Sequence, residues 1–286
     1  EDFSISRLKE KMPWGIPVPG DDTQVMYVWF DALVNYIATL GWPNTEGDFQ
    51  KYWVDGTPTQ YCGKDNTRFQ GIMWQAMLMA AGLPNSKHIV INGFIQSGGQ
   101  KMSKSTGNVL SPEDIIKDFK EVTDFSEDVL RFVLLHEIPS FDDGDITKES
   151  IRTSYTSHLQ NGIGNLTNRI MKMATSHGVV CLDTLRKDSP DIFKTLDTFD
   201  TKKAIEMVME EVRNLDKFIQ DTEPFKVIKK DEDKGILLIG DCVADLHRIA
   251  HNLSVFMPAT SAKILECLEE HKMPENPLFG RITIVE

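Results

Sequence analysis

Apolar positions in the first third of the chain alternate between short strand-like runs and helical runs. Residues 24–29 predict a strand that leads into a helix at about 31–40, and residues 59–62 predict a second strand. Between about 66 and 81, apolar side chains recur every three or four positions, as in an amphipathic helix. Residues 88–92 predict a further, buried strand. This alternation predicts an α/β fold with a parallel, doubly wound, Rossmann-type sheet that binds ligands at the carboxyl ends of its strands.

Different signals flank this region. Residues 1–24 are rich in glycine and proline and predict irregular or edge structure. Ser111 precedes a proline and predicts a helix start, because serine caps helix N-termini and proline fits the first turn. Ser126 predicts the cap of a helix over 127–136, and the polar, glycine-containing residues 139–145 predict a linker.

The last part of the chain carries a helical pattern almost throughout. Long amphipathic stretches with short connections predict an antiparallel all-α bundle. The expected helices are 148–176, 202–220, 234–256 and 261–271. The chain is therefore expected to have an α/β part followed by an all-α part.

Composition narrows the class of protein. Hydrophobic residues make up 41% of the chain, enough for a buried core, and no apolar run approaches the roughly 18 to 20 residues of a membrane span. The 4 cysteines are scattered, with neither a Cys-x-x-Cys pair nor a histidine at ligand spacing. We therefore expect no membrane partner, no metal site and no disulfide framework, and a reducing compartment.

The formal net charge of -12 is unusual for a nucleic-acid-binding protein, because neutralisation of phosphates supplies much of the affinity in such proteins. An RNA partner would have to bind local basic patches on an acidic body. Lys226, Lys229 and Lys230 form one candidate patch.

The stretch Lys101, Met102, Ser103, Lys104 and Ser105 carries the clearest chemistry. Two ammonium groups three positions apart can neutralise charge on a departing pyrophosphate, and glycines on both sides would let the loop close over ATP. The alternative is an ordinary solvated loop. The five residues match the signature loop of class I aminoacyl-tRNA synthetases. The resemblance implies that residues 101–104 bind ATP and that Lys101 and Lys104 are catalytic.

Residues 27–36, Tyr-Val-Trp-Phe-Asp-Ala-Leu-Val-Asn-Tyr, resemble the methionine-pocket segment of methionyl-tRNA synthetases. Aromatic rings suit a thioether side chain, because its polarizable sulfur packs favourably against them. The alternative is that these aromatics belong to the core. Trp29 is expected at a strand end and Tyr36 one turn into the next helix. The methionine-binding residues that the resemblance implies are Trp29, Ala32, Leu33, Tyr36 and Gln70, the last in place of a histidine.

Gly63-Lys64-Asp65 also matches the family. Asp65 at a strand end can accept hydrogen bonds from a ribose, although it could equally cap the helix that follows. The family often has His-Gly where this chain has Asn92 and Gly93. The nucleotide contacts that the resemblance implies, besides the lysine loop, are Gly63, Asp65, Asn92, Gly93 and Ile95.

The helical part resembles the anticodon-binding domain of methionyl-tRNA synthetases. Asn165 and Arg169 are four positions apart, so they share one helix face and suit the reading of unstacked bases. The alternative is ordinary helix polarity. The family has a Pro-Trp pair where this chain has Pro224 and Phe225, and the smaller ring can still stack on a base. The resemblance implies that Asn165, Arg169 and Phe225 bind a CAU anticodon.

The resemblance implies three parts: the second half of a Rossmann-type catalytic domain (1–110), a stem-contact or linker region (111–146) and an anticodon-binding bundle (147–286). It implies a ligase that uses ATP and Mg²⁺ to activate L-methionine and charge the tRNA. None of the 7 histidines lies in the His-x-Gly-His element of this class. A missing N-terminal half is therefore expected, as part of a longer protein or as a separate chain.

Two rival functions stay open at this point. One is another class I synthetase, such as a leucyl or cysteinyl enzyme, and the other is a non-catalytic tRNA-binding fragment. The sequence favours neither a cytoplasmic nor a mitochondrial location.

Overall fold

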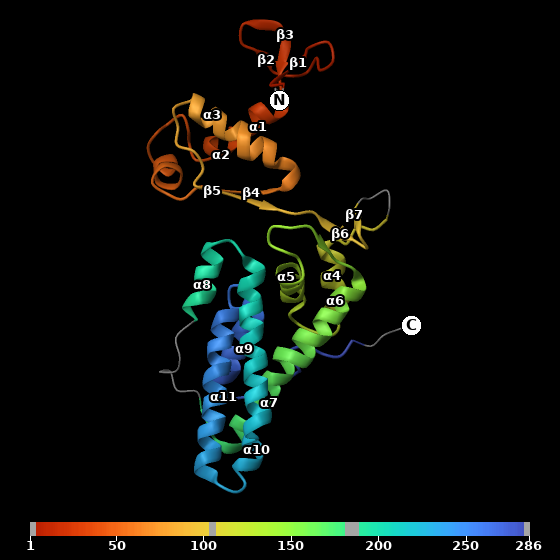
Figure 1. Ribbon diagram of the computed structural model, residues 1–286, viewed down its shortest axis with the longest axis vertical. Helices are drawn as coiled ribbons and strands as arrows, with labels where there is room; N and C mark the ends of the chain where they lie inside the picture. The colour runs from red at the N-terminus through yellow and green to blue at the C-terminus, as the bar shows by residue number, and fades with distance from the viewer. Residues whose placement is uncertain (1–3, 103–106, 181–188, 283–286) are drawn as a thin grey trace. The chain divides into compact units, whose positions relative to one another are not determined.

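The computed structural model describes residues 4–102, 107–180 and 189–282. The chain forms two compact units, Glu1–Gly93 and Phe94–Glu286, and each is described by itself (Figure 1). Within the described ranges, no helix is both long and apolar enough to cross a membrane.

The first unit begins with a three-stranded antiparallel sheet of order β1-β3-β2. Its strands are β1 (Ser6–Leu8), β2 (Pro17–Val18) and β3 (Asp21–Met26). Residues 1–24 were predicted as irregular or edge structure, and β1 and β2 are indeed the edge strands of this sheet, with glycine and proline in the turns between strands. Gly20, with φ of 85°, follows Pro19 and makes the sharp turn between β2 and β3. The strand predicted over 24–29 ends at Met26 and belongs to this antiparallel sheet.

A parallel strand pair forms the second part of this unit. Residue pairing between β4 (Thr59–Gly63) and β5 (His88–Asn92) runs in register from Thr59 opposite His88 to Gly63 opposite Asn92. Parallel neighbours need a crossover connection, and here it is helical. The helix predicted over 66–81 is a continuous helical stretch of three geometries: the 3₁₀ turn η2 (Lys64–Asn66), the π-helix η3 (Arg68–Met73) and α3 (Trp74–Ala80).

Short helices complete the first unit and supply its core. They are α1 (Val28–Ala32), α2 (Asn35–Ala38) and the π-helix η1 (Phe49–Val54). Apolar side chains from these helices pack against the crossover helix and exclude water. The buried cluster consists of Leu33, Ile37, Phe49, Trp53, Met73, Trp74 and Leu78.

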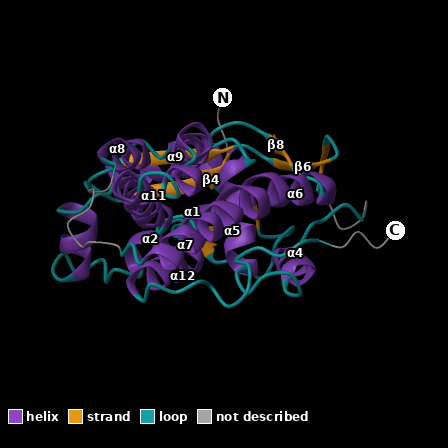
Figure 2. Ribbon diagram, turned by 90° about the horizontal axis from the view of Figure 1, so that it is seen from below, coloured by secondary structure: helices purple, strands orange, loops and turns teal. Residues whose placement is uncertain are grey.

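The second unit opens with three short strands of order β7-β6-β8. They are β6 (Ile95–Ser97), β7 (Gln100–Lys101) and β8 (Gly144–Asp145), and Figure 2 shows β6 and β8 side by side. Gly98 and Gly99 have φ of 64° and 71°, which suits the tight turn between β6 and β7. Asp145 accepts a hydrogen bond of 2.8 Å from the Gly99 N–H. Residues 139–145 are therefore not only a linker, because they contribute β8.

The remainder of the second unit is helical, and the predicted α/β part followed by a helical bundle is confirmed. Helices α7, α9 and α12 each contact α11, and Figure 1 shows α9 and α11 running side by side. The helices are α4 (Pro112–Phe119), α5 (Ser126–His136), α6 (Lys148–Ser154), the π-helix η4 (Tyr155–Gly164), α7 (Asn165–His177), α8 (Pro190–Asp197), α9 (Thr201–Thr222), α10 (Pro224–Val227), α11 (Glu232–Leu253) and α12 (Pro258–Glu269).

Two predicted helix starts can be compared with the structure. Ser111 caps α4, because its hydroxyl accepts a 3.1 Å hydrogen bond from the Asp114 N–H. Ser126 is the first residue of α5, and Phe125 occupies the cap position, so that predicted cap is displaced by one residue.

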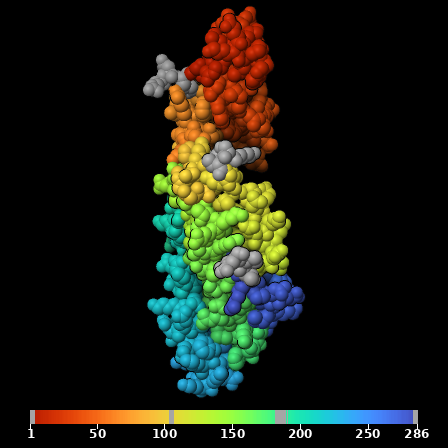
Figure 3. All heavy atoms as spheres, turned by 90° about the vertical axis from the view of Figure 1, so that its right-hand side faces the viewer, coloured from red at the N-terminus to blue at the C-terminus, as the bar shows by residue number. Residues whose placement is uncertain are grey.

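The helix predicted over 148–176 is divided into α6, η4 and α7. The backbone leaves helical geometry at Gly162, with φ of -86° and ψ of -110°. A Cβ on Gly164 would lie 3.2 Å from the Phe279 ring, so glycine permits the C-terminal stretch to pack closely here. Tyr155 donates a 2.8 Å hydrogen bond to the carbonyl of Gly280. Figure 3 shows this blue C-terminal stretch against the green part of the chain.

Candidate functional site

The carboxyl ends of β4 and β5 carry the first group of predicted site residues. Gly63 ends β4 directly opposite Asn92, the last residue of β5, and Gly93 follows it. The carboxyl edge of a parallel pair is where α/β folds bind nucleotides. A Cβ on Gly63 would lie 2.9 Å from the carboxylate Oδ1 of Asp65. Glycine therefore leaves room for an exposed Asp65 carboxylate beside this edge.

The alternative role of Asp65 as a helix cap is wrong. Thr67 occupies the position before η3, and no side chain caps that helix. The Asp65 carboxylate is exposed in the 3₁₀ turn that begins the crossover. It is thus placed to contact a ligand at the strand edge.

The same crossover brings an aromatic wall close to Asp65. Phe69 lies four positions after Asp65, and its ring stacks on Trp29 at 4.7 Å with an interplanar angle of 13°. Tyr27 approaches the other side of this group, with its ring 6.2 Å from Phe69. Trp29 lies in α1 and not at a strand end as predicted, because the chain turns into a helix at Val28.

The other predicted methionine-binding residues differ in exposure. Leu33 is buried in the core, whereas Ala32 is exposed. Tyr36 lies in α2 with 37% of its surface exposed, and its ring is 6.0 Å from that of the buried Trp74. Trp29 is half-buried. The two aromatic residues thus keep surface for a ligand, while Trp74 forms the core behind Tyr36.

Gln70 is a buried polar residue with an unusual environment. It is 7% exposed, and its Oε1 has no hydrogen-bond partner among the described residues. A buried amide oxygen without a partner costs stability, so such groups call for a specific explanation.

The remaining predicted ATP contacts lie in the second unit. Ile95 in β6 is 40% exposed. Lys101 in β7 is exposed, with its Nζ 5.3 Å from the centroid of the Phe94 ring, and Met102 is partly buried against the core. Ser103 and Lys104 lie outside the described residues. The described part of the loop therefore presents one free-standing ammonium group next to an aromatic ring.

The predicted anticodon contacts lie on the helical bundle. Asn165 is exposed at the first position of α7, and Arg169 forms an ion pair with Asp216 of α9. Phe225 is 41% exposed at the start of α10. Asp216 lies in α9, and Phe225 lies in α10, the next helix along the chain.

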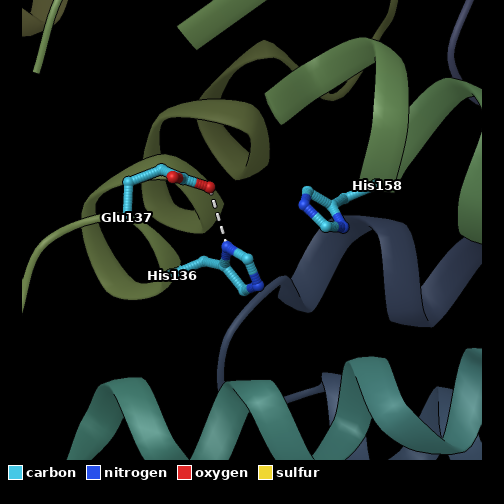
Figure 4. A group of neighbouring side chains, drawn as sticks. All are labelled: His136, Glu137 and His158. Carbon is cyan, nitrogen blue, oxygen red and sulfur yellow. Dashed lines mark hydrogen bonds and ion pairs between the residues drawn. The ribbon is translucent and has the colours of Figure 1, made fainter. Parts of the chain in front are cut away.

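The sequence analysis missed one cluster, formed by His136, Glu137 and His158 (Figure 4). The hydrogen bond from His136, at 2.8 Å, is the main cause that lowers the pKa of Glu137 to about 2. Burial, followed by the field of His136, lowers the pKa of His158. The expectation of no metal site rested on cysteine spacing, and no spacing rule links His158 to a pair more than twenty positions earlier.

The described residues form an α/β part that leads into a helical bundle. The family model described as "tRNA synthetases class I (M)" matches residues 1–171, more than half of the chain. The chain therefore belongs to this family of class I aminoacyl-tRNA synthetases.

Several known proteins resemble the chain over nearly its full length. It is 33% identical to a methionine–tRNA ligase of Mesorhizobium japonicum over 94% of the chain and 52% of that protein. It is also 33% identical to that of Fusobacterium nucleatum, over 99% of the chain and 49% of that protein. A structure of Mycobacterium tuberculosis methionyl-tRNA synthetase in complex with methionyl-adenylate matches with a TM-score of 0.82 and 26% identity, over 98% of this chain and 60% of that one. The chain thus spans about half the length of the curated relatives it matches.

Proposed function

We propose that the chain provides the methionine pocket, part of the ATP site and the anticodon-binding bundle of a methionine–tRNA ligase. One observation in particular supports this function. Asp65 stands at the carboxyl edge of the parallel pair, and Phe69, one helical turn later, stacks on Trp29 at 4.7 Å. The crossover thus carries a carboxylate for a ribose and a ring that stacks on Trp29, the proposed wall for a thioether.

In the proposed reaction, the carboxylate of methionine attacks the α-phosphorus of ATP, which is bound as its Mg²⁺ complex. Methionyl-adenylate forms and pyrophosphate leaves, and the acyl group then passes to the 3′-terminal adenosine of the tRNA. Trp29, Ala32 and Tyr36 hold the side chain of methionine, with Leu33 behind them and the Gln70 amide beside them. The chain supplies no covalent nucleophile, so catalysis is by positioning and electrostatics.

Each predicted nucleotide contact has its own role in this proposal. Asp65 accepts hydrogen bonds from the ribose, and Gly63, Asn92 and Gly93 let the nucleotide approach the backbone. Ile95 contacts adenine, and Met102 and Ser103 belong to the loop that binds ATP. Lys101 and Lys104 neutralise the negative charge that moves onto the departing pyrophosphate.

The bundle recognises the tRNA in this proposal. Asn165 and Arg169 contact bases of the CAU anticodon, and Phe225 stacks on one of them. The ion pair with Asp216 fixes the direction of the Arg169 guanidinium before the tRNA binds.

The three parts of the chain have different roles in this proposal. Residues 1–110 serve catalysis, residues 111–146 contact the tRNA stem, and residues 147–286 read the anticodon. The activity belongs to the whole protein, because half the length of the relatives has no counterpart here.

Amino-acid-dependent exchange of pyrophosphate into ATP tests the function. The chain is assayed joined to, or mixed with, the N-terminal segment of a curated relative, with methionine, leucine or cysteine as substrate. We expect exchange with methionine only. Exchange with leucine or cysteine would assign another synthetase, and tRNA binding without any exchange would favour a non-catalytic tRNA-binding fragment.

The Lys104→Ala variant tests the role of the loop in the same assay. The exchange rate should fall by about 100-fold or more while the KM for methionine changes little, since the lysine acts on charge that develops only in the transition state. The Lys9→Ala variant, at an exposed lysine outside all the proposed contacts, serves as the control and should keep the rate. Equal losses in rate and methionine affinity would contradict the assigned role of Lys104.

A further inference from the structure

Two histidines and a glutamate from two separate segments meet in the second unit (Figure 4). His136 is the last residue of α5 and Glu137 caps that helix, whereas His158 comes from η4. One potential ligand atom from each residue lies within 4.8 Å of the other two. Over residues 4–102, 107–180 and 189–282, this is the one group of three or more such side chains at metal-ligating distance.

The surrounding structure holds these side chains together. Consecutive helix positions normally point apart, but α5 ends at His136, so Glu137 can turn back and accept its hydrogen bond. The buried Phe132 ring stacks on His136 at 4.8 Å and lies 5.9 Å from His158. The two imidazole rings are 4.6 Å apart. Ser154 donates a 2.6 Å hydrogen bond to the Glu137 carboxylate and orients it.

We propose that His136, Glu137 and His158 bind a divalent transition-metal ion, with Zn²⁺ as the best match. Two imidazole nitrogens and one carboxylate oxygen are a ligand set that Zn²⁺ accepts, with water in a fourth position. Zinc bonds of about 2.0 to 2.2 Å place tetrahedral ligand atoms about 3.4 Å apart. The present separations of up to 4.8 Å therefore require the side chains to approach by roughly 1 Å.

Metal binding requires a carboxylate and neutral imidazoles. The hydrogen bond between His136 and Glu137 is replaced when the ion enters.

The cluster can be reached from solvent. Glu137 and His158 line an open groove of about 420 Å³, whose rim includes a further carboxylate, Glu149. Water in this groove can fill the fourth coordination position.

Two cations lie nearby: Arg213 contributes to the lowered pKa of His158, and Lys202 donates at 3.3 Å to the backbone carbonyl of Glu137. The Lys202 ammonium is also 3.9 Å from the Glu206 carboxylate, which partly compensates its charge.

A bound ion would join the end of α5 to the π-helical segment η4. This segment contains the backbone kink at Gly162 and leads directly into α7, which carries Asn165 and Arg169. The expected effect is stabilisation of the kinked connection in front of α7. The proposal concerns binding and stability only, so it does not depend on the proposed function.

Zinc binding to the tag-free, chelator-treated chain tests the proposal. Isothermal titration with Zn²⁺ should give one ion per chain, and Co²⁺ should give the visible absorption of a low-symmetry site. The Tm of the second unit should rise by about 5 °C when free Zn²⁺ is a hundredfold above its Kd. The His136→Gln and His158→Gln variants should each weaken binding by at least tenfold.

A matched control uses the second histidine pair of the chain. His247 and His251 are one helical turn apart with rings separated by 4.6 Å, so they could also attract an ion. The His251→Gln variant should keep full affinity for Zn²⁺ and the same Co²⁺ spectrum.

Circular dichroism and the Tm without metal show that each variant is folded. Two results would overturn the proposal. One is unchanged zinc affinity in a His136→Gln, His158→Gln double variant, and the other is no Tm shift in the parent chain when excess Zn²⁺ is added.

Discussion

Gln70 and Gln75 lie five positions apart on one helical stretch, and their amide groups have opposite environments. The Gln75 amide donates to the Gln70 carbonyl at 3.0 Å and accepts from Asn85 and from the Ser86 N–H at 3.1 and 3.0 Å. The Oε1 of Gln70 has no partner among the described residues. We infer that the Gln70 amide is available to a ligand and that the Gln75 amide is structural.

The Gln70→Leu variant tests this difference. An unpaired buried oxygen is removed, so the free energy of unfolding should stay the same or rise by up to about 1 kcal/mol. The KM for methionine in the exchange assay should rise, because the pocket loses a polar contact. Urea denaturation and exchange kinetics provide the two measurements.

Gln75→Leu is the matched control for that variant. It removes several satisfied hydrogen bonds and should lower the free energy of unfolding by about 1 to 3 kcal/mol. If Gln70→Leu lost as much stability as Gln75→Leu, the Gln70 amide would be satisfied within the fold and the inference would be wrong.

Cys242 gives a prediction for the pH dependence of stability. Burial is the main cause that raises the pKa of its thiol to about 12 from an ordinary value of 9.0, and Asp245 and Asp241 add to the effect. The folded state therefore keeps the thiol proton above pH 9, where the unfolded state loses it. This stabilising contribution is complete below pH 9 and is lost progressively as the pH rises toward 12.

The Cys242→Ala variant should therefore show a shallower loss of stability above pH 9 than the parent chain, whatever its stability at pH 7. Chemical denaturation at pH 7, 9 and 10 measures the difference in slope. Cys62→Ala, at a cysteine of the other unit, provides a comparison. Identical alkaline slopes for the parent chain and Cys242→Ala would show that the Cys242 thiol titrates normally.

At the scale of elements, the junction of α9 and α10 determines how Phe225 is presented. Glu223 has φ of 44°, a left-handed conformation that ends α9, and Pro224 begins α10 at once. Lys226 is tied to Glu223 at 2.5 Å and lies 5.9 Å from the Phe225 ring. The ring is thus held at a sharp corner of the chain beside a positive charge.

Replacing the ring tests this corner as a stacking platform. Phe225→Ala should weaken binding of tRNA with a CAU anticodon by about 5- to 150-fold, the equivalent of about 1 to 3 kcal/mol. Phe225→Trp should match or exceed the parent affinity because the ring is larger. Filter binding at fixed salt measures both variants.

Leu237 supplies the control for the stacking prediction, because it is an exposed apolar residue of α11 with 71% of its surface exposed. Leu237→Ala should leave the affinity for tRNA unchanged. A Phe225→Ala variant with parent affinity would remove Phe225 from the anticodon site.

The elements themselves were predictable to different degrees. The long helices of the bundle were predicted within a few residues, because their apolar periodicity and the cap at Ser111 are local signals. The two-residue strand β8 was missed, since it exists only through pairing with β6, almost fifty positions earlier. The kink at Gly162 was also missed, because a single glycine within a helical pattern does not specify its own backbone angles.

The candidate site was predictable where the chain order itself carries the information. Gly63 and Asp65 follow a strand, and their positions could be read directly from that order. The stacking of Phe69 on Trp29 depends on the path of the crossover and could not be predicted. The unpaired oxygen of Gln70 likewise results from packing in three dimensions.

At the scale of the whole molecule, the net charge of -12 and the proposed tRNA partner have to be reconciled. The exposed lysines Lys226, Lys229 and Lys230 lie close together at the start of α10 and just beyond it, next to Phe225. This local positive charge is where a phosphate backbone would meet the bundle. The account therefore places recognition in one small region of an otherwise acidic protein.

The central claim is that Trp29, Tyr36 and Asp65 of the first unit bind the methionyl-adenylate. It is tested most directly by a crystal structure of the whole protein with a non-hydrolysable methionyl-adenylate analogue. We predict the methionyl side chain against Trp29 and Tyr36 and the ribose at Asp65. An analogue bound with Trp29 and Asp65 both out of contact would contradict this claim.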